Sequence, residues 1–452
     1  MRLRKTITTI VATAILLAGW QLFAVIANQP ELIPSLPRLV RTLCEWLVSG
    51  SFYQSVGATI LRGILGMSIS FVCAIGMAGL FARFEWVYEL FRPLLAIMRS
   101  IPVISFILLA LIFLNPESIP LMIAFLTMFP LLTENLTRGI LDLRPGLSIM
   151  ARQFHIKRSN VLFQIIYPQL KPFLYSGLAS AAGFGWRAII MGEVLSQCAF
   201  GIGSEMKRAQ NFIAVPELLA WTIVAVFISF FFDKGISKVA DITPKISFAN
   251  EDQTIPTPTL SVLDTKDISY QYGIQHFSHS FQKGIIYGIS APSGKGKTTL
   301  LNLIGGILLP TEGEIHPTRH FGIATIFQQP QLLPHLTAEE NIILPLSFFL
   351  TEEKARRIAQ KHLQEMEMEP FGNRYPKELS YGQQQRIAIA RALAYPSPLL
   401  LMDEPFKGLD EALSHRIIER IREKQMKEER IILFTSHNPD EIRLLADEVI
   451  YL

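Results

Sequence analysis

A glycine-rich run near the middle of the chain has the residue types needed to hold phosphate groups. It reads GISAPSGKGKTT over Gly288–Thr299, after a β-type stretch and before an apolar helix. Glycines let backbone N–H groups curl around phosphate oxygens, and the helix N-terminus adds partial positive charge. Lys297 is then placed to reach the β- and γ-phosphates, and the Thr298 hydroxyl to ligate Mg²⁺.

The run departs at one position from the pattern G-x-x-x-x-G-K-[ST]. Ala291 stands where the first glycine is usual, which is tolerable if that residue keeps a negative φ. A glycine-rich turn with a chance Gly-Lys-Thr is the alternative interpretation. The residues expected to contact nucleotide are Ala291, Pro292, Ser293, Gly294, Lys295, Gly296, Lys297, Thr298 and Thr299.

Two carboxylates end a buried-strand pattern further along the chain. The pattern LLLMDE covers residues 399–404. Asp403 at the strand end can hold Mg²⁺ through water, and Glu404 is then placed to polarise the attacking water. Paired acids at a strand end can also be simply solvated or cap a helix. The upstream phosphate loop favours ATP hydrolysis.

The segment Leu379–Arg386, LSYGQQQR, lies between these two motifs and just before a helix. At these residues the chain resembles the ATP-binding cassette family, whose signature is L-S-G-G-Q. Ser380, Gly382 and Gln383 match, and Tyr381 departs. The resemblance implies that the serine and glycine address the γ-phosphate held by a second cassette. Two cassettes would then meet head-to-tail around ATP.

Further elements follow in the family's order. Gln328 resembles the glutamine of the loop that senses Mg²⁺ and contacts the permease. Asp410 resembles the aspartate of the dimer-facing D-loop, and His437 resembles the switch histidine that contacts the γ-phosphate. The resemblance covers about residues 258–452.

An aromatic residue before the phosphate loop is the expected adenine contact. Tyr272 resembles the tyrosine that stacks on the base, with Tyr270 as its rival. A lone Tyr or His is more often structural, but six elements in the right order make coincidence a poor explanation. The hypothesis is an ATPase that uses ATP and Mg²⁺, with Glu404, His437 and Lys297 as its catalytic residues.

The residues around these motifs predict an α/β P-loop ATPase domain with a helical subdomain over residues 260–452. Short apolar runs alternate with helical stretches, as expected for a largely parallel central sheet. Residues 243–259, rich in Pro, Thr and acidic side chains, read as a linker. The strand-like runs are 284–291, 399–402 and 431–435, and the helical ones 352–366 and 411–427.

Residues 1–242 read as an α-helical transmembrane permease domain. Residues 1–240 are almost continuously apolar, whereas the rest of the chain has ordinary soluble composition. Each of six apolar stretches is close to the ~20 residues that a helix needs to cross a bilayer. The expected spans are 6–27, 62–82, 94–114, 119–137, 174–197 and 217–233.

Basic residues predict the orientation of these spans. With the N-terminus inside, most Lys and Arg beside the spans are cytoplasmic, and the ATPase domain is cytoplasmic too. The first span could instead be a cleaved signal peptide, although its apolar run is long for one. No dense basic stripe interleaved with aromatics supports a nucleic-acid partner, and the three scattered cysteines support neither a metal site nor a disulfide framework.

The loop at 138–172 is the longest cytoplasmic connection between the expected spans. It resembles the E-A-A…G…I…L-P loop of binding-protein-dependent importers, a short helix that docks onto the cassette. Ala151, Ile165 and Pro168 match, while Ile149 and His155 replace the acidic residue and the glycine. The permease as a whole resembles those for nitrate, sulfonates, taurine or thiamine-pyrimidine precursors.

Two ionisable residues fall within the expected fifth span. Arg187 and Glu193 are candidates for lining the transport path, since charges inside a membrane usually serve function. Alternatively, Glu193 lies at the outer headgroup level, and Arg187 pairs with it across about two helical turns.

These features predict a primary active importer half-unit in the bacterial cytoplasmic membrane. It would work as a homodimer with an extracytoplasmic solute-binding protein and a small anionic or heterocyclic solute. A heteromeric assembly with a related chain stays open, as does a slower ATPase because of Ala291 and Tyr381. The alternatives are an exporter, whose long cytoplasmic helical extensions are missing here, and a membrane-anchored regulatory ATPase that moves no solute.

Overall fold

The chain folds as two compact units. The computed structural model describes residues 2–240, 244–253, 260–271, 273–292, 294–317 and 322–452. One unit, called here the membrane unit, consists of residues 1–143 and 169–243. The other, called here the cassette unit, consists of Arg144–Pro168 and Pro244–Leu452. The inserted segment Arg144–Pro168 therefore belongs structurally to the cassette, although membrane helices flank it in the sequence.

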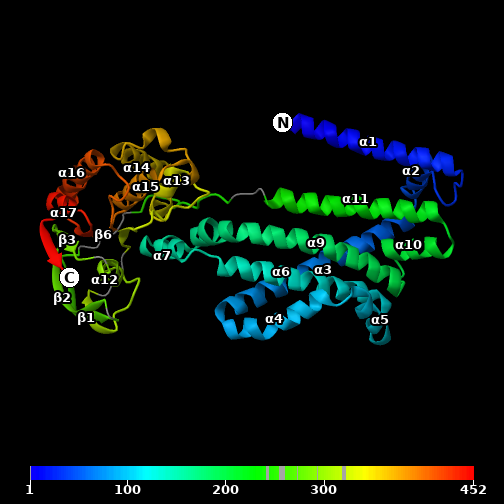
Figure 1. Cartoon of the computed structure of the whole chain (residues 1–452), viewed down its shortest axis with the longest axis horizontal. Coiled ribbons are helices and arrows are strands. Elements are labelled where there is room, and N and C mark those ends of the chain that lie inside the picture. The colour runs from blue at the N-terminus through cyan, green and yellow to red at the C-terminus, as the bar shows by residue number, and fades with distance from the viewer. Residues whose placement is uncertain (1, 241–243, 254–259, 272, 293, 318–321) are drawn as a thin grey trace. The chain divides into compact units, whose positions relative to one another are not determined.

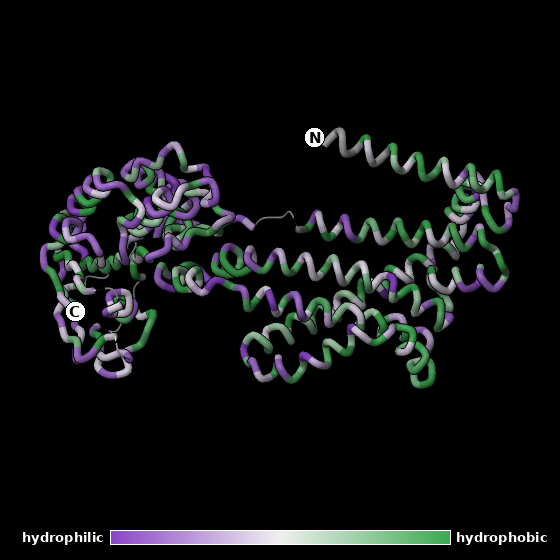
Figure 2. The backbone as a smooth tube through the Cα atoms, viewed as in Figure 1, coloured by the Kyte–Doolittle hydropathy of each residue, from purple (hydrophilic) through white to green (hydrophobic). Residues whose placement is uncertain are grey.

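The membrane unit is helical, as expected, and hydrophobic residues run along its helices (Figures 1 and 2). Helix α9 begins with the last two residues of the inserted segment and continues into the membrane unit. The elements are α1 (Arg2–Ala27), α2 (Leu36–Trp46), α3 (Gly50–Arg83), α4 (Glu85–Ser100), α5 (Val103–Phe113), η1 (Pro116–Ser118), α6 (Ile119–Leu141), α9 (Tyr167–Ser196), α10 (Ile202–Asn211) and α11 (Val215–Ala240).

The expected count of six spans is met only roughly. Among the described residues, four helices are long and apolar enough to cross a membrane, and a bent pair makes a fifth candidate. The four contain or overlap the expected spans 62–82, 119–137, 174–197 and 217–233. In the described part of α1, the apolar stretch Val11–Ala27 is shorter than a full span.

The expected span 94–114 is not one continuous helix. Its residues belong to α4 and α5, which meet at a 95° bend. Ile101 there is extended, with φ −71° and ψ 130°. Pro102 explains the break, because proline disfavours the helical conformation of the residue before it and has no N–H to continue the helix.

Small residues allow the long helices of the membrane unit to pack closely. A Cβ on Gly66 of α3 would lie 2.6 Å from the Cβ of Ala124 of α6. A Cβ on Gly185 of α9 would lie 2.1 Å from Cε of Met128. Since lipid supplies little hydrophobic drive between helices, such close backbone approach is what holds them together.

The cassette unit contains two sheets. The five-stranded sheet is parallel and has the order β5-β6-β7-β3-β8, which confirms the predicted α/β fold. The three-stranded sheet is antiparallel, in the order β2-β1-β4. The strands are β1 (Val262–Tyr270), β2 (Ile274–Gln282), β3 (Ile286–Ser290), β4 (Glu312–His316), β5 (Ala324–Ile326), β6 (Leu399–Asp403), β7 (Ile431–Thr435) and β8 (Glu448–Tyr451).

Helices surround the parallel sheet, and β6 and β7 are buried along their whole length. Because the carboxyl ends of parallel strands share one edge, the residues that follow β3, β6 and β7 are brought together there. The helices are α7 (Pro145–Gln153), α8 (Arg158–Asn160), η2 (Val161–Ile166), α12 (Lys297–Ile304), α13 (Ala338–Leu346), α14 (Glu352–Glu365), η3 (Glu369–Phe371), η4 (Pro376–Glu378), α15 (Tyr381–Ala394), α16 (Glu411–Glu428) and α17 (Pro439–Leu445).

The described part of the expected linker has fixed contacts within the cassette unit. The backbone N–H of Ala249 donates to the Ser347 carbonyl at 3.0 Å, and that of Gln253 to the Phe349 carbonyl at 2.8 Å. Ile246 and Phe248 also pack against the hydrophobic core. Residues 254–259 lie outside the described residues, and the domain boundaries stay a prediction.

Candidate nucleotide and magnesium site

The phosphate loop lies between β3 and α12, as predicted. Gly296 has φ +89° and caps α12, and a Cβ on it would lie 2.8 Å from the Gly273 carbonyl oxygen, so only glycine fits there. Ala291 lies outside the left-handed region, which satisfies the condition for replacing glycine. Nζ of Lys297 donates to the Ala291 carbonyl at 2.7 Å, and the residue is 7% exposed.

Most of the residues expected to contact nucleotide therefore lie in one loop and in the first turn of the helix that follows it. Pro292, Gly294 and Lys295 complete the described loop, and Thr298 and Thr299 lie in the first turn of α12. Ser293 and Tyr272 lie outside the described residues. Tyr270, the rival of Tyr272, ends β1 and packs against the core beneath that strand.

A hydroxyl–carboxylate pair joins the phosphate loop to β6. Oγ1 of Thr298 donates to Oδ2 of Asp403 at 2.9 Å, and Oγ1 of Thr435, at the end of β7, donates to Oδ1 of Asp403 at 2.8 Å. Gln328 lines the same cavity of about 280 Å³ as Thr298 and Asp403. These side chains present the oxygen ligands that Mg²⁺ prefers, so they fit the expected metal. Thr435 was not expected from the sequence, where it is only the last residue of an apolar run.

Glu404 lies between a lysine and a histidine beside this pair. Its Oε1 is 3.0 Å from Nε2 of His437 and its Oε2 is 3.1 Å from Nζ of Lys407. Burial alone would raise the pKa of Glu404, but the hydrogen bond and charge of Lys407, together with His437, outweigh it and hold that pKa below its ordinary value. The carboxylate is thus ionised, as a group that orients water must be. Lys407 in this role was missed by the sequence reasoning.

The signature segment forms the start of α15. Ser380 is its N-cap, and its side chain accepts from the N–H of Gln383 while the Gln383 side chain accepts from the Ser380 N–H. The residue is exposed, so the start of this helix is open to an outside partner. Gly382 approaches the next loop closely, since a Cβ there would lie 2.6 Å from the Gly408 carbonyl oxygen.

Two contacts connect the signature segment to its surroundings. The hydroxyl of Tyr381 donates to the Gln328 carbonyl at 2.8 Å, so the departing residue is tied to the glutamine loop. Asp410 caps α16, its Oδ1 accepting from the Leu413 N–H at 2.9 Å. Within one chain, Ser380, Gly382 and Asp410 are therefore at helix starts beside the loop after β6, not on the phosphate loop itself.

In the membrane unit, the pairing of Arg187 with Glu193 is wrong. Glu193 is fully buried and accepts from Nη1 of Arg62 at 2.7 Å, from Oγ1 of Thr59 at 3.0 Å and from the Gly203 N–H at 3.0 Å. Arg62 lies on α3, far from Glu193 in the sequence, so periodicity within one helix could not reveal the pair. Glu193 ties α3, α9 and the start of α10 together.

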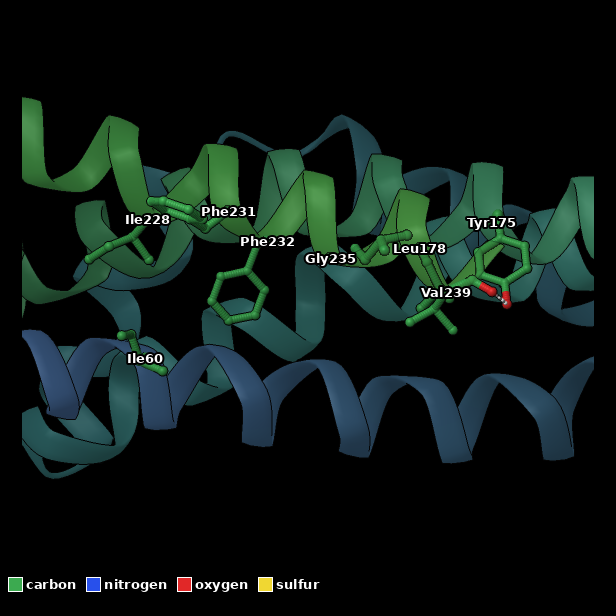
Figure 3. A pocket seen from close by; sticks show the side chains of 9 residues that line it. Ile60, Tyr175, Leu178, Ile228, Phe231, Phe232, Gly235 and Val239 are labelled. Atoms are coloured by element: carbon green, nitrogen blue, oxygen red, sulfur yellow. Dashed lines mark hydrogen bonds between the residues drawn. The ribbon is translucent and has the colours of Figure 1, made fainter. Parts of the chain in front are cut away.

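Two cavities of the membrane unit differ in polarity. One, of about 600 Å³ between α3, α9 and α11, carries no charged side chain on its lining (Figure 3). Its Tyr175 hydroxyl donates to the Val239 carbonyl at 3.1 Å. The other, of about 720 Å³, includes Arg187 and Asp233 in its lining. Only the second offers charges to a polar solute.

A parallel sheet with a phosphate loop, two acids and a histidine gathered at one edge defines a P-loop ATPase. Residues 274–407 match the family described as ABC transporter, and residues 56–233 match the binding-protein-dependent transport system inner membrane component. The chain belongs to the ABC transporter family, with a permease component and an ATP-binding cassette fused in one polypeptide. The cassette is thus an ATP-binding ATPase.

Curated relatives match the cassette half. An uncharacterized ABC transporter ATP-binding protein of Methanocaldococcus jannaschii is 35% identical over 201 residues, 40% of this chain and 85% of that protein. The thiamine import ATP-binding protein ThiQ of Yersinia pseudotuberculosis serotype I is 34% identical over 205 residues, 42% and 86%. The Fe(3+) ions import ATP-binding protein FbpC of Rhizobium etli is 35% identical over 189 residues, 40% of this chain but only 54% of that protein.

Proposed function

We propose that this protein is the half-unit of a primary active importer for a small anionic or heterocyclic solute. Residues 1–242 form its permease domain, 243–259 a linker and 260–452 the cassette. The observation that carries the proposal is the inserted segment Arg144–Pro168, which lies between membrane helices in the sequence but packs as part of the cassette unit. Movement in the cassette therefore has a covalent route to α6 and α9.

The proposed site works through the chain's own side chains. Lys297 holds the β- and γ-phosphates, while Glu404 orients the attacking water and His437 contacts the γ-phosphate. Thr298, Asp403 and, through its loop, Gln328 hold Mg²⁺, which neutralises charge developing on the phosphate oxygens. The oxygen atoms of Thr298 and Asp403, 2.9 Å apart, support this assignment.

The remaining residues are assigned to a second copy of the chain. Ser380, Gly382, Gln383 and Asp410 complete the ATP site of the partner copy, which supports a homodimer. The exposed start of α15, separate from the phosphate loop of its own chain, favours this arrangement. Because each site would be incomplete without the other chain, dimerisation and ATP closure are one event.

The surroundings follow from the permease match. We place the protein in the bacterial cytoplasmic membrane, as a multi-pass protein with its cassette in the cytoplasm, working with an extracytoplasmic solute-binding protein. The match to a binding-protein-dependent component and the import relatives favour import over export. Arg187, exposed on α9 in the charged cavity, is assigned to the solute path because a charge facing lipid is costly.

Reconstitution tests this function. The purified chain in proteoliposomes is expected to hydrolyse Mg-ATP. Hydrolysis should be faster when a ligand-loaded solute-binding protein of the same organism is present on the side of the membrane opposite the cassette. Uptake of that ligand should require ATP. Hydrolysis that no loaded binding protein accelerates, together with no uptake, would contradict the importer and favour a membrane-anchored ATPase.

A further inference from the structure

Gln153, the last residue of α7, joins the inserted segment to the nucleotide-binding part of the cassette. Its Nε2 donates to the Gly305 carbonyl at 2.8 Å, and its own carbonyl accepts from the Ile323 N–H at 2.7 Å. Oγ1 of Thr325 donates to its Oε1 at 3.4 Å. The residue is 7% exposed, so these contacts are shielded from water.

The two partners of this amide lie at the end of α12, which carries Thr298, and in β5, which precedes Gln328 in the chain. Gly305 is the C-cap of α12, the helix that begins with Lys297 and Thr298. Thr325 lies in β5, and the chain leaves that strand towards Gln328. A shift of either element on gain or loss of the γ-phosphate therefore moves a hydrogen-bond partner of Gln153.

A cavity runs beside this connection. The cavity has a volume of about 280 Å³. Its lining includes Gly146 and Ile149 of the inserted segment as well as Thr298, Gln328 and Asp403. The segment and the magnesium residues thus share one space, with α12 and β5 as its walls.

The neighbour of Gln153 supplies the apolar part of the contact. Phe154 is fully buried, with its ring 5.4 Å from the guanidinium carbon of Arg391 and 5.2 Å from the ring of Tyr395. Arg391 in turn donates to the carbonyls of Pro330 and Gln331, at 2.9 and 2.8 Å. Phe154 anchors the segment by apolar packing. The hydrogen bonds of Gln153 then set the position of the segment on the cassette.

A second buried amide of the same segment provides the contrast. Nδ2 of Asn160 donates to the Ser247 carbonyl and to Oγ of Ser347, both at 2.8 Å, and Oδ1 accepts from the Ser247 N–H at 2.9 Å. These partners lie after the membrane helices and at the end of α13, away from the phosphate loop and β5. Asn160 therefore holds the segment without touching an element that leads to nucleotide.

We propose that Gln153 is a positioning residue for coupling: it sets the register of the inserted segment on α12 and β5, so that rearrangement around the γ-phosphate is passed to α6 and α9. A buried amide left without partners is costly, so the segment must follow when Gly305 or Thr325 moves. This inference rests on the proposed importer function, but it concerns a residue to which the ATP-site motifs give no role.

Amide hydrogen exchange of the full chain in lipid, with and without Mg-ATP, tests the proposal. In the wild type and in Asn160→Leu, Mg-ATP should slow exchange in residues 288–304 and also change it in residues 144–168. In Gln153→Met, the first response should persist while the second falls by about tenfold, the size of an ordinary coupling between sites. Thr325→Val, which keeps the side-chain volume, should give an intermediate loss and serves if Gln153→Met fails to fold.

The outcomes separate this inference from the proposed function. If Mg-ATP does not slow exchange in residues 288–304 of the wild type, nucleotide binding and thus the proposed function fail. If that response is present but Gln153→Met and Thr325→Val behave as the wild type does, Gln153 has no coupling role. An equal loss in Asn160→Leu would also overturn the proposal, because general docking would then explain it.

Discussion

Glu404 in the cassette unit and Glu193 in the membrane unit are both carboxylates held by cations, yet their surroundings give them opposite capacities. Glu404 meets His437 and Lys407, both about half exposed, at the open edge of the parallel sheet. Glu193 is sealed from solvent and has its bonds shared among Arg62, Thr59 and the Gly203 N–H. An ionised carboxylate whose partners are open to solvent can act on a substrate. A buried carboxylate whose hydrogen bonds are all made within the protein instead holds helices together.

Removing the charge of Glu404 should have the largest effect. We expect Glu404→Gln to lower kcat for ATP hydrolysis by about 10²–10⁴-fold, since a positioned general base contributes that much. The amide keeps the shape of the side chain, so ATP should stay bound and trapped between two copies. Steady-state hydrolysis and retention of labelled ATP measure both effects. Undiminished turnover would remove Glu404 from the proposed reaction.

The same comparison predicts the reverse behaviour at Glu193. Glu193→Ala leaves Arg62 and Thr59 in place without their buried partner, and breaking a buried ion pair costs about 3–5 kcal/mol of folding free energy. The fraction that stays folded should hydrolyse ATP at the basal wild-type rate. Thermal unfolding in detergent, with basal hydrolysis of the soluble fraction, checks this.

Arg187→Met is the matched control for that loss of stability. Arg187 is exposed on the same helix, so its removal should leave the unfolding temperature nearly unchanged while reducing uptake of an anionic solute. Normal uptake in Arg187→Met would count against its place in the path. A stable Glu193→Ala would mean that the buried network is not what joins α3, α9 and α10.

The next effect concerns pH. Because Lys407 holds the pKa of Glu404 below its ordinary value, the carboxylate stays ionised as pH falls, and only below the lowered pKa is it protonated. Lys407→Met removes that support, so the acid limb of kcat should move to higher pH by roughly one unit, the shift that one nearby charge typically produces. Lys427→Met, an exposed lysine of α16, should leave the profile in place.

Much of the cassette site was predictable because its residues are contiguous in the sequence. The phosphate loop and the pair Asp403–Glu404 each lie on one strand end, where pattern and chemistry coincide. What the pattern missed is non-local: Thr435 reaches Asp403 from the neighbouring strand, and Gln153 reaches Gly305 from a segment between membrane helices. Such contacts are set by sheet order and docking, which no local periodicity contains.

In the membrane unit, hydropathy located the helices but not their shape. The bend between α4 and α5 follows from Pro102. That proline is visible in the sequence, but the length of the apolar run around it favoured the prediction of a single span. The partner of Glu193 was out of reach for a different reason. Arg62 lies on another helix, and only the close packing of α3 against α6 and α9 brings it to the carboxylate.

The smallest expected effect tests where the cassette site tolerates change. Tyr381 departs from the family signature, and its hydroxyl makes one bond to the Gln328 carbonyl from an exposed position. A single neutral hydrogen bond contributes about 0.5–1.5 kcal/mol, so Tyr381→Phe should change kcat by only a few-fold. If the bond serves to hold the glutamine loop near Mg²⁺, the apparent affinity for Mg²⁺ should fall more than that for ATP. If Tyr381→Phe reduced kcat as far as Glu404→Gln does, Tyr381 would belong to the hydrolytic machinery. It would then act together with Glu404 on the solvent-accessible side of the comparison with Glu193.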